Sequence, residues 1–303
     1  MLISKLLTIY TPLIGWTGVG WIAARFLPAS IPGYIGKGLF WVGVPIGIVA
    51  FLRHAQVSWS LWIAPATAWV AILLGILLAG VWLQRSRWSS QTRISFMLTS
   101  MVGNTGYIGF PVSLILVGQQ HFAWAVFYDL LGSTLGAYGL GVALAARSHQ
   151  EEYVWTQTMV TLASNPALWS FWVGLLVRDA PLPGWLETSL RTTAWMMVSL
   201  SLILIGMRLS QLRSLKSIQP AAMSLMIKML LVPLIVGGGL WLAGITGAVH
   251  RVLLLQAAMP PAFASLVISE AYERDPEMAV TAIAIGCLGL LGTLPIWLWL
   301  SSG

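Results

Sequence analysis

The sequence predicts an all-helical protein that crosses a membrane several times, and three observations support this fold class. Hydrophobic residues make up 58% of the 303-residue chain, whereas charged residues make up 8%. A soluble domain usually carries about 25% charged residues, so this chain has too few charges to cover a surface that faces water. The 17 Trp residues fit a bilayer, because the amphipathic indole ring favours the interface between lipid and water.

The charge and the single cysteine exclude other classes of protein. The net charge of +7 could suggest nucleic-acid binding, but the basic residues stand singly between apolar runs and form no polar cluster. We therefore expect no nucleic-acid partner. Cys287 lies within an apolar run, so the sequence contains neither a disulfide framework nor a group of metal ligands. No metal and no resident cofactor are expected.

A membrane-spanning helix needs about 20 mostly apolar residues, and the chain contains ten such segments, joined by short connections. They cover roughly 7–26, 33–52, 61–84, 94–117, 121–146, 158–177, 187–208, 219–243, 249–271 and 277–300. The first segment has features of a signal peptide, since Lys5 precedes it and the small residues Ala23 and Ala24 lie near its end. Its apolar run is longer than a usual signal sequence, so we interpret it as a span.

The distribution of Lys and Arg between the helices predicts the orientation in the membrane. One side carries ten basic residues: Arg25, Lys37, Arg85, Arg87, Arg93, Arg147, Arg208, Arg213, Lys216 and Arg274. The other side carries five: Lys5, Arg53, Arg178, Arg191 and Arg251. Because cytoplasmic loops are rich in Lys and Arg, we expect the first side in the cytoplasm and both termini on the non-cytoplasmic side of the plasma (inner) membrane.

The two halves of the chain resemble each other. In both, an arginine precedes a methionine by eight positions at the head of an apolar helix that is then interrupted: Arg93 and Met101 in helix four, Arg251 and Met259 in helix nine. Five helices per repeat is an odd number, so the second copy enters from the opposite side, as in the inverted repeats of secondary transporters. The predicted organisation is a first repeat (1–146), a short cytoplasmic linker (147–157) and a second repeat (158–303).

Gly and Pro residues interrupt helices four and nine at matching places, in segments 103–111 and 259–265. Freed backbone groups are tolerated at membrane depth only where they face protein or a wet cavity, and half-helix N-termini attract anions. Two breaks in register therefore predict a binding site near the midplane. The predicted substrate-binding residues are Gly103, Asn104, Thr105, Gly106, Pro260, Pro261, Ala262 and Phe263, with Pro111 as a helix break.

Three charged residues are candidates for proton or ion coupling. Asp129 follows His121 by eight residues, which places it about 12 Å into its span at helical rise, and charges at that depth tend to mark ion or proton pathways. Lys228 also lies within a helix, where the alternative is that its side chain snorkels to the interface. Glu270 lies near the end of helix nine, where the alternative is an interfacial position.

Enzyme motifs are absent from the sequence. It contains no G-x-S-x-G, no H-E-x-x-H and no P-loop. An intramembrane aspartyl protease needs two buried aspartates, and only Asp129 qualifies. We therefore predict that the protein is not an enzyme.

Several motifs, in this order along the chain, resemble the auxin efflux carrier family of membrane transporters. They are Gly103-Asn104-Thr105-Gly106-Tyr107-Ile108-Gly109-Phe110-Pro111, Phe127-Tyr128-Asp129-Leu130-Leu131, Asn165-Pro166-Ala167, Leu204-Ile205-Gly206-Met207-Arg208-Leu209, Lys228-Met229-Leu230-Leu231-Val232-Pro233, Ala258-Met259-Pro260 and Glu270-Ala271-Tyr272 with Asp275-Pro276-Glu277. The resemblance covers most of the chain beyond residue 90 and is weak before it.

The resemblance implies ten helices in two inverted repeats, with broken helices four and nine crossing where an organic anion binds. It also implies a scaffold of helices one, two, six and seven that often forms a homodimer, and a mobile transport domain built from the other helices. The chain departs from many bacterial members in having Ala262, where they carry an asparagine just after the ninth-helix proline. This departure leaves Asn104 and backbone amides to hold the substrate, and it argues against a dicarboxylate.

The predicted function is secondary active transport of a small organic anion, a carboxylate, by alternating access in the lipid bilayer. A proton is the first candidate for the coupling ion, and Na⁺ is the second. Two alternatives stay open. A sodium-coupled symporter of the bile-acid type would need a cluster of oxygen ligands, for which Asn104, Thr105 and Ser265 are a small supply. A receptor that uses the same fold without turnover would bind its ligand and transport nothing.

Overall fold

The computed structural model describes residues 2–28, 30–146, 156, 159–160, 162–210 and 217–301. Within these residues the chain is helical and contains no β-strand. Most of the predicted linker 147–157 lies outside the described residues, as do Arg147, Arg213 and Lys216 of the predicted cytoplasmic side. The chain divides into two compact units, one made of residues 1–58, 106–126 and 165–212, the other of 59–105, 127–164 and 213–303.

Unit 1 contains the helices expected for a scaffold, together with the segment 106–126. Its elements are α1 (Leu2–Ala23), α2 (Ile31–Gly38), the π-helix η1 (Leu39–Gly43), α3 (Val44–Leu52), most of the π-helix η3 (Thr105–Gly109), α6 (Phe110–Leu116), the 3₁₀ turn η4 (Gln119–His121), most of α7 (Phe122–Tyr128), α10 (Pro166–Leu176) and α11 (Gly184–Ser210). Asn165 caps α10, because its Oδ1 accepts a hydrogen bond from the Ala167 N–H at 3.0 Å.

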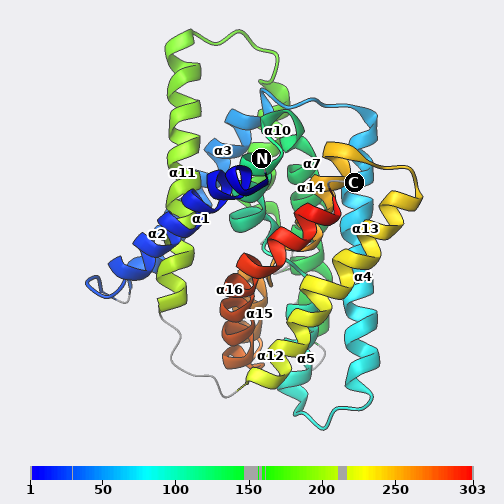
Figure 1. The fold of residues 1–303 in the computed structure, drawn as a ribbon. Coiled ribbons are helices and arrows are strands. Elements are labelled where there is room, and N and C mark those ends of the chain that lie inside the picture. The colour runs from blue at the N-terminus through cyan, green and yellow to red at the C-terminus, as the bar shows by residue number, and fades with distance from the viewer. Residues whose placement is uncertain are drawn as a thin grey trace. The chain divides into compact units, whose positions relative to one another are not determined.

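Helices α1 and α11 cross in backbone-to-backbone contact, as Figure 1 shows for the blue and light-green ribbons. A Cβ on Gly20 would overlap the Ile203 carbonyl oxygen, and one on Gly206 would overlap the Thr17 carbonyl oxygen. Each helix therefore supplies one glycine at the point of closest approach. Small residues that let backbones meet are the usual basis of helix packing in membranes, where no hydrophobic force draws helices together.

Unit 2 contains the remaining helices. Its elements are the 3₁₀ turn η2 (Trp59–Trp62), α4 (Ile63–Leu83), α5 (Ser90–Met101), the π-helices η5 (Asp129–Thr134) and η6 (Gly136–Gly141), α8 (Val142–Ala145), α12 (Ile218–Leu225), the π-helix η7 (Met226–Leu231), α13 (Val232–Leu242), α14 (Gly247–Ala257), α15 (Phe263–Ala271) and α16 (Pro276–Leu300). Figure 1 shows α4 and α5 joined by a short turn, with the yellow helices α12 beside α5 and α13 beside α4.

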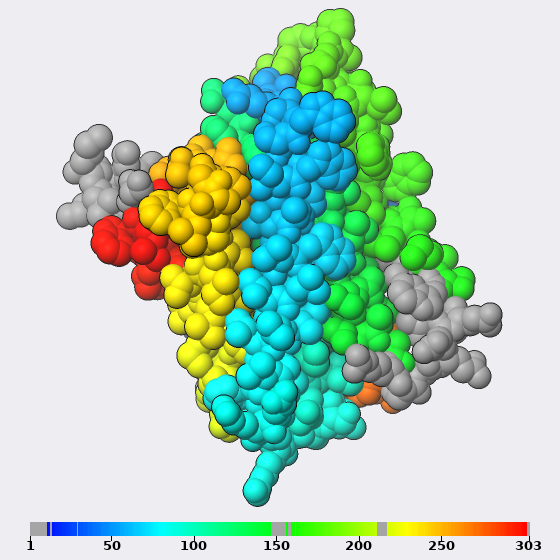
Figure 2. Space-filling view, turned by 90° about the vertical axis from the view of Figure 1, so that its right-hand side faces the viewer, coloured from blue at the N-terminus to red at the C-terminus, as the bar shows by residue number. Residues whose placement is uncertain are grey.

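The outer face of unit 2 is apolar. Along α4 the side chains of Val70, Leu73, Leu77 and Val81 recur at helical spacing and are more than half exposed. Figure 2 shows α4 in cyan with α13 in yellow next to it, and α13 exposes further large apolar side chains, among them Trp241. Soluble monomers rarely expose contiguous apolar surfaces of this kind, so this face fits contact with lipid.

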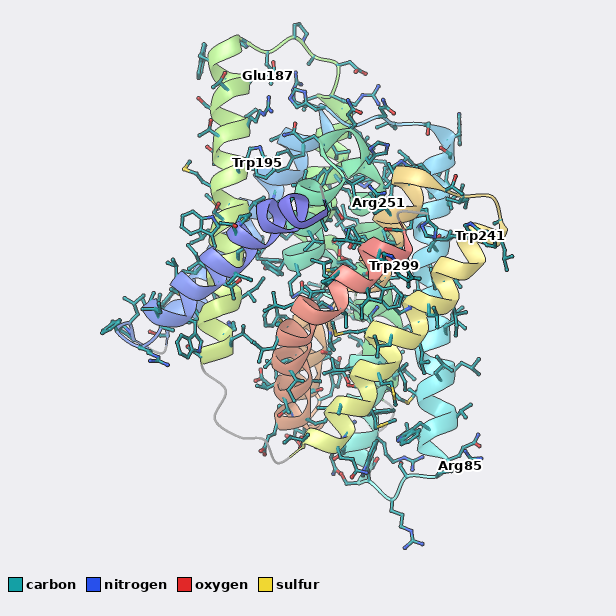
Figure 3. The ribbon with its side chains drawn as sticks, in the orientation of Figure 1. Arg85, Glu187, Trp195, Trp241, Arg251 and Trp299 are labelled. Carbon is teal, nitrogen blue, oxygen red and sulfur yellow. The ribbon has the colours of Figure 1, made fainter. Side chains whose placement is uncertain are left out.

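Five continuous helical stretches in the described part of the chain are long and apolar enough to cross a membrane. They are 31–52, 59–83, 184–210, 218–242 and 276–300. Each matches a predicted span to within a few residues, which agrees with a polytopic membrane protein. Figure 3 shows Arg85 beyond one end of α4 and Trp241 near the end of α13 on the opposite side of unit 2, so a charged residue and an amphipathic residue mark opposite ends of these two helices. The other predicted spans and the inverted repeat stay predictions.

Candidate functional site

Two helix breaks lie against each other inside unit 2. One break, at 102–104, separates α5 from η3, and the other, at 258–262, separates α14 from α15. The two breaks run antiparallel: the Asn104 N–H donates to the Pro260 carbonyl at 2.7 Å, and the Ala262 N–H donates to the Val102 carbonyl at 3.0 Å. This short ladder satisfies backbone groups that have lost their helical partners, which is what a break at membrane depth requires.

The sequence prediction placed these breaks correctly but mistook their extent. The first break covers 102–104 and precedes Thr105, where η3 begins. The structure shows no break at Pro111, because it lies within the helical stretch that runs without interruption from Thr105 to Leu116, where η3 passes into α6. Gly106 and Pro111 belong to unit 1, where both line a small apolar cavity with Phe51 and Phe122. The candidate site in unit 2 therefore loses these two residues.

Asp129 lies at the first break. It begins η5 and is buried, and the Thr105 hydroxyl donates a hydrogen bond to its Oδ1. Thr105 itself is only 1% exposed, and the neighbouring Asn104 is 4% exposed. The structure thus brings together an amide, a hydroxyl and a carboxylate that the sequence had assigned to two separate roles. The hydroxyl that was expected to meet substrate is instead engaged by the candidate coupling residue.

Lys228 lies at the second break. Its side chain is 2% exposed, and its Nζ donates a hydrogen bond to the Ala257 carbonyl oxygen at 2.7 Å, at the C-terminal end of α14. The alternative of a snorkelling lysine is therefore wrong. A Cβ added to Gly103 would lie 3.0 Å from Lys228 Cε and 3.1 Å from the Met259 carbonyl oxygen, so the lysine also touches the first break. Both breaks consequently have a buried charge beside them.

Not every predicted residue belongs to the crossover. Pro260, Pro261 and Ala262 form the second of its two extended segments and are buried. Phe263 begins α15 next to them and is partly buried. Glu270 lies at the other end of α15 and is exposed, so the structure supports its interfacial alternative and separates it from the site.

A second polar cluster in unit 2 was not recognised as one from the sequence. Ser95 and Ser269 share a hydrogen bond of 2.9 Å, and the Ser95 Oγ also accepts from the Asp275 N–H at 3.0 Å. The Asp275 carboxylate accepts from the Thr92 hydroxyl at 2.7 Å and caps α16 through the Met278 N–H at 2.9 Å. The Asp275-Pro276 pair is a usual helix start, which could have shown the cap, but not its partners on α5.

The described residues contain no group of three or more His, Cys, Asp or Glu side chains that could hold a metal ion. The polar groups at the crossover are instead backbone amides and carbonyls, one amide side chain, one hydroxyl, one carboxylate and one ammonium group. Such a set can bind a small charged solute and exchange protons. It contains no nucleophile paired with a base, which nucleophilic catalysis would need.

Comparisons with known proteins agree with this description. A family model described as membrane transport protein matches residues 12–298. An uncharacterized transporter of Methanothermobacter thermautotrophicus is 26% identical over 259 residues, which is 84% of each chain. An uncharacterized transporter of Methanocaldococcus jannaschii is 25% identical over 209 residues, or 67% of each chain.

The family match and the relatives identify the chain as a membrane transporter, not an enzyme. The chain belongs to the membrane transport protein family, the auxin efflux carrier family that its motifs resemble, and the match extends over nearly the whole sequence. It is an integral membrane protein.

Proposed function

We propose that the protein is a secondary transporter that carries a small organic anion, a carboxylate, through the crossover of the two broken helices. The observation that carries the proposal is the paired backbone of 102–104 and 260–262, next to which two half-helices begin. The N-terminal amides of α15 begin at Phe263, and amides at a helix start favour an anion through their hydrogen bonds and through the helix dipole.

The charges beside the crossover support an anionic substrate. The Lys228 ammonium is the one cationic side chain that the described residues place at the breaks, and it lies within contact of Gly103. Asn104 offers an amide group for the same ligand. All these groups are buried, so an anion reaches them only in a different conformation. The division of the chain into two compact units supports alternating access as the way in which that conformation arises.

Coupling, topology and assembly complete the proposal. Asp129 is the candidate proton carrier, because it is a buried carboxylate at the first break. We retain ten spans in two inverted repeats, both termini on the non-cytoplasmic side of the plasma membrane, and a homodimer formed through the scaffold helices. Uptake driven by an imposed pH gradient in proteoliposomes, with Asp129→Asn as the comparison, tests the proton.

A ligand screen tests the site. The purified protein is heated in detergent with malate, smaller carboxylates and indole-3-acetate, and we expect at least one to raise the Tm. Asn104→Ala should reduce this ligand-induced rise, and Asn104→Ala combined with Thr105→Ala should abolish it. Asn165→Ala is the matched control, because it removes a cap in unit 1: it lowers the Tm but leaves the ligand-induced rise unchanged. A rise that survives the double substitution places the ligand elsewhere.

Two transport measurements separate the alternatives. Uptake that requires Na⁺ in place of choline would indicate a sodium symporter. Binding without flux in sealed vesicles would indicate a receptor. We expect uptake that does not depend on Na⁺, for the reason developed below.

A further inference from the structure

Lys228 is a buried ammonium group without an acidic partner among the described residues. The ion pairs recorded there join His54 with Glu187 and Arg178 with Asp179. An isolated charge is costly to bury, so main-chain oxygens must offset this cost. The group that does so is the Ala257 carbonyl, which accepts from Nζ at 2.7 Å.

The prolines of the second break explain why this carbonyl is available. In an α-helix the carbonyl of residue i accepts from the N–H of residue i+4. For Gln256 and Ala257 those donors would be residues 260 and 261, which are both prolines and have no N–H. The Gln256 carbonyl accepts from the Met259 N–H instead, in a long contact of 3.4 Å. For Ala257, the Lys228 ammonium replaces the missing donor.

The surroundings of Nζ resemble those of a bound monovalent cation. The last carbonyls of α14 carry the negative end of its dipole. Unwound carbonyls and half-helix C-termini are the groups that coordinate monovalent cations in transporters with broken helices. Gly103 keeps this space open, because a Cβ there would lie 3.2 Å from Lys228 Nζ and 3.1 Å from the Met259 carbonyl oxygen. The ammonium therefore occupies a carbonyl-lined position between the two breaks.

We propose that Lys228 is a tethered cation: its ammonium fills a monovalent-cation site at the C-terminal end of α14, where the Ala257 carbonyl accepts its hydrogen bond, and shortening its side chain creates a site for a free cation. The wild-type protein then needs no dissolved Na⁺ or K⁺ at the crossover. This inference deepens the coupling part of the proposed function. The test of this inference uses no organic anion. The inference can therefore be disproved while the proposed anion site remains supported, and the anion site can be disproved while the inference remains supported.

The experiment measures the Tm of the purified full-length protein in choline chloride, NaCl, KCl and methylammonium chloride at equal ionic strength. The wild type should melt at the same temperature in all four salts. Lys228→Ala should melt several degrees lower in choline. At least one small cation should then restore several degrees in a saturable way, as expected for a ligand that binds only the folded state. Lys228→Ser should respond at lower cation concentration, because its hydroxyl adds an oxygen ligand.

Two controls isolate the cation effect. Lys228→Met removes the charge but fills the volume, so it should be destabilised in all four salts without recovery. Lys37→Ala removes a lysine of unit 1 and should behave like the wild type.

Three results would overturn the proposal. The first is a Lys228→Ala or Lys228→Ser protein whose Tm is no more sensitive to small cations than that of Lys228→Met. The second is failure of both small variants to fold even when they are expressed and extracted in these salts. The third is a wild-type Tm that itself rises in Na⁺ or K⁺ relative to choline.

Discussion

The hydroxyl of Thr105 donates a hydrogen bond to the carboxylate of Asp129, and this contact joins the first helix break to η5. The two residues are 24 positions apart in the chain, and both are buried. The contact holds the carboxylate beside the first break.

Replacing Thr105 with Val keeps the shape of the side chain and removes the donor. We expect a loss of about 1.5–3 kcal/mol in the free energy of unfolding, because a hydrogen bond to a buried charged group is lost. Thr105→Ser should restore most of it. The measurement is unfolding in detergent, followed by circular dichroism. The control is Thr67→Val, whose hydroxyl bonds only to the Ile63 carbonyl within α4. Equal losses in the two valine variants would contradict the role assigned to Thr105.

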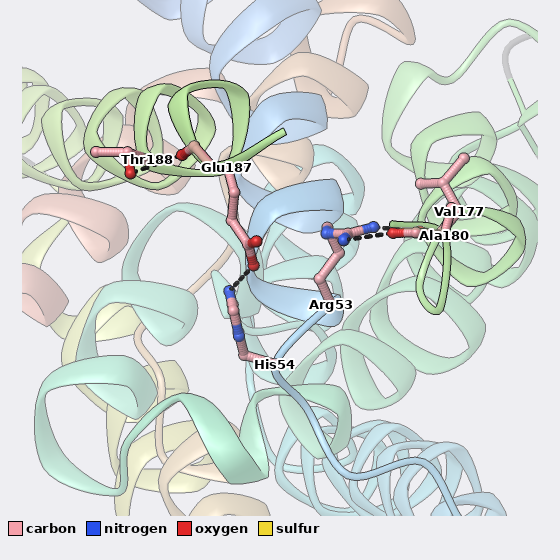
Figure 4. Close-up of polar contacts among 7 residues, drawn as sticks. Arg53, His54, Val177, Ala180, Glu187 and Thr188 are labelled. Atoms are coloured by element: carbon pink, nitrogen blue, oxygen red, sulfur yellow. Dashed lines mark hydrogen bonds and ion pairs between the residues drawn. The ribbon is translucent and has the colours of Figure 1, made fainter. Parts of the chain in front are cut away.

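Arg53 in unit 1 ties the end of α3 to the end of α10. Its guanidinium donates to the carbonyl oxygens of Val177 and, at 2.8 Å, Ala180, as Figure 4 shows. Arg53→Ala should lower the free energy of unfolding by about 2 kcal/mol or more, because two charge-assisted hydrogen bonds at a helix C-terminus are lost.

Arg178 provides the comparison for Arg53. It pairs with the neighbouring exposed Asp179, and an exposed pair contributes little to stability. Arg178→Ala should therefore leave the Tm nearly unchanged. If Arg53→Ala also left the Tm unchanged, the hydrogen bonds from Arg53 to the two carbonyl oxygens would contribute nothing measurable to stability.

Gly286 on α16 gives the second break its space. A Cβ there would lie 2.8 Å from Leu225 Cδ2, 2.9 Å from Pro260 Cβ and 3.0 Å from Pro261 Cδ. Gly286→Ala should cost about 1–3 kcal/mol through overpacking, even though alanine favours a helix. Gly289→Ala, in the same helix with nothing near the added Cβ, should be neutral or stabilising. The measurement is the Tm of both variants. A stabilised Gly286→Ala protein would contradict the prediction and would show that the prolines can move to make room for the added methyl group.

Asp275 holds α16 to α5 through its cap and through Thr92. Asp275→Ala should cost about 1–2 kcal/mol, the usual range for a lost cap. It should also speed amide hydrogen exchange in the first turn of α16. Asp275→Asn keeps an oxygen for the cap, so its stability should lie between that of the wild type and that of Asp275→Ala. Unchanged exchange near Met278 in the alanine variant would mean that other contacts hold this helix end.

The long apolar helices could be predicted from the sequence because each membrane-spanning helix must itself be long enough and carry few enough charges to cross the lipid. The structure places α13 at Val232–Leu242 as the end of the stretch 218–242, where 219–243 was predicted. The Asn165 cap was equally local, since a side chain two residues from its amide partner decides it. The breaks were visible for the same reason, because Gly and Pro act on their own helix.

The partners across the crossover could not be predicted. The bonds of Asn104 to Pro260 and of Ala262 to Val102 join residues from different halves of the chain, and no local pattern encodes that pairing. The orientation of Lys228 depended on a missing donor in another helix, so composition alone suggested an interfacial lysine as readily as a buried one. Pro111 was predicted as a break because proline often interrupts helices, whereas here it follows the π-helix η3 in an uninterrupted helical stretch.

Both buried charges of unit 2 lie in π-helical turns: Asp129 begins η5, and Lys228 lies within η7. A π-turn holds an additional residue relative to the surrounding α-helix. The turn absorbs this residue, so deleting one residue from Met226–Leu231 would let the segment relax to α geometry while the helix on either side keeps its register. Side chains inside the turn would then point in a new direction. The number of residues in the helix, as well as their identity, thus sets where each charge points.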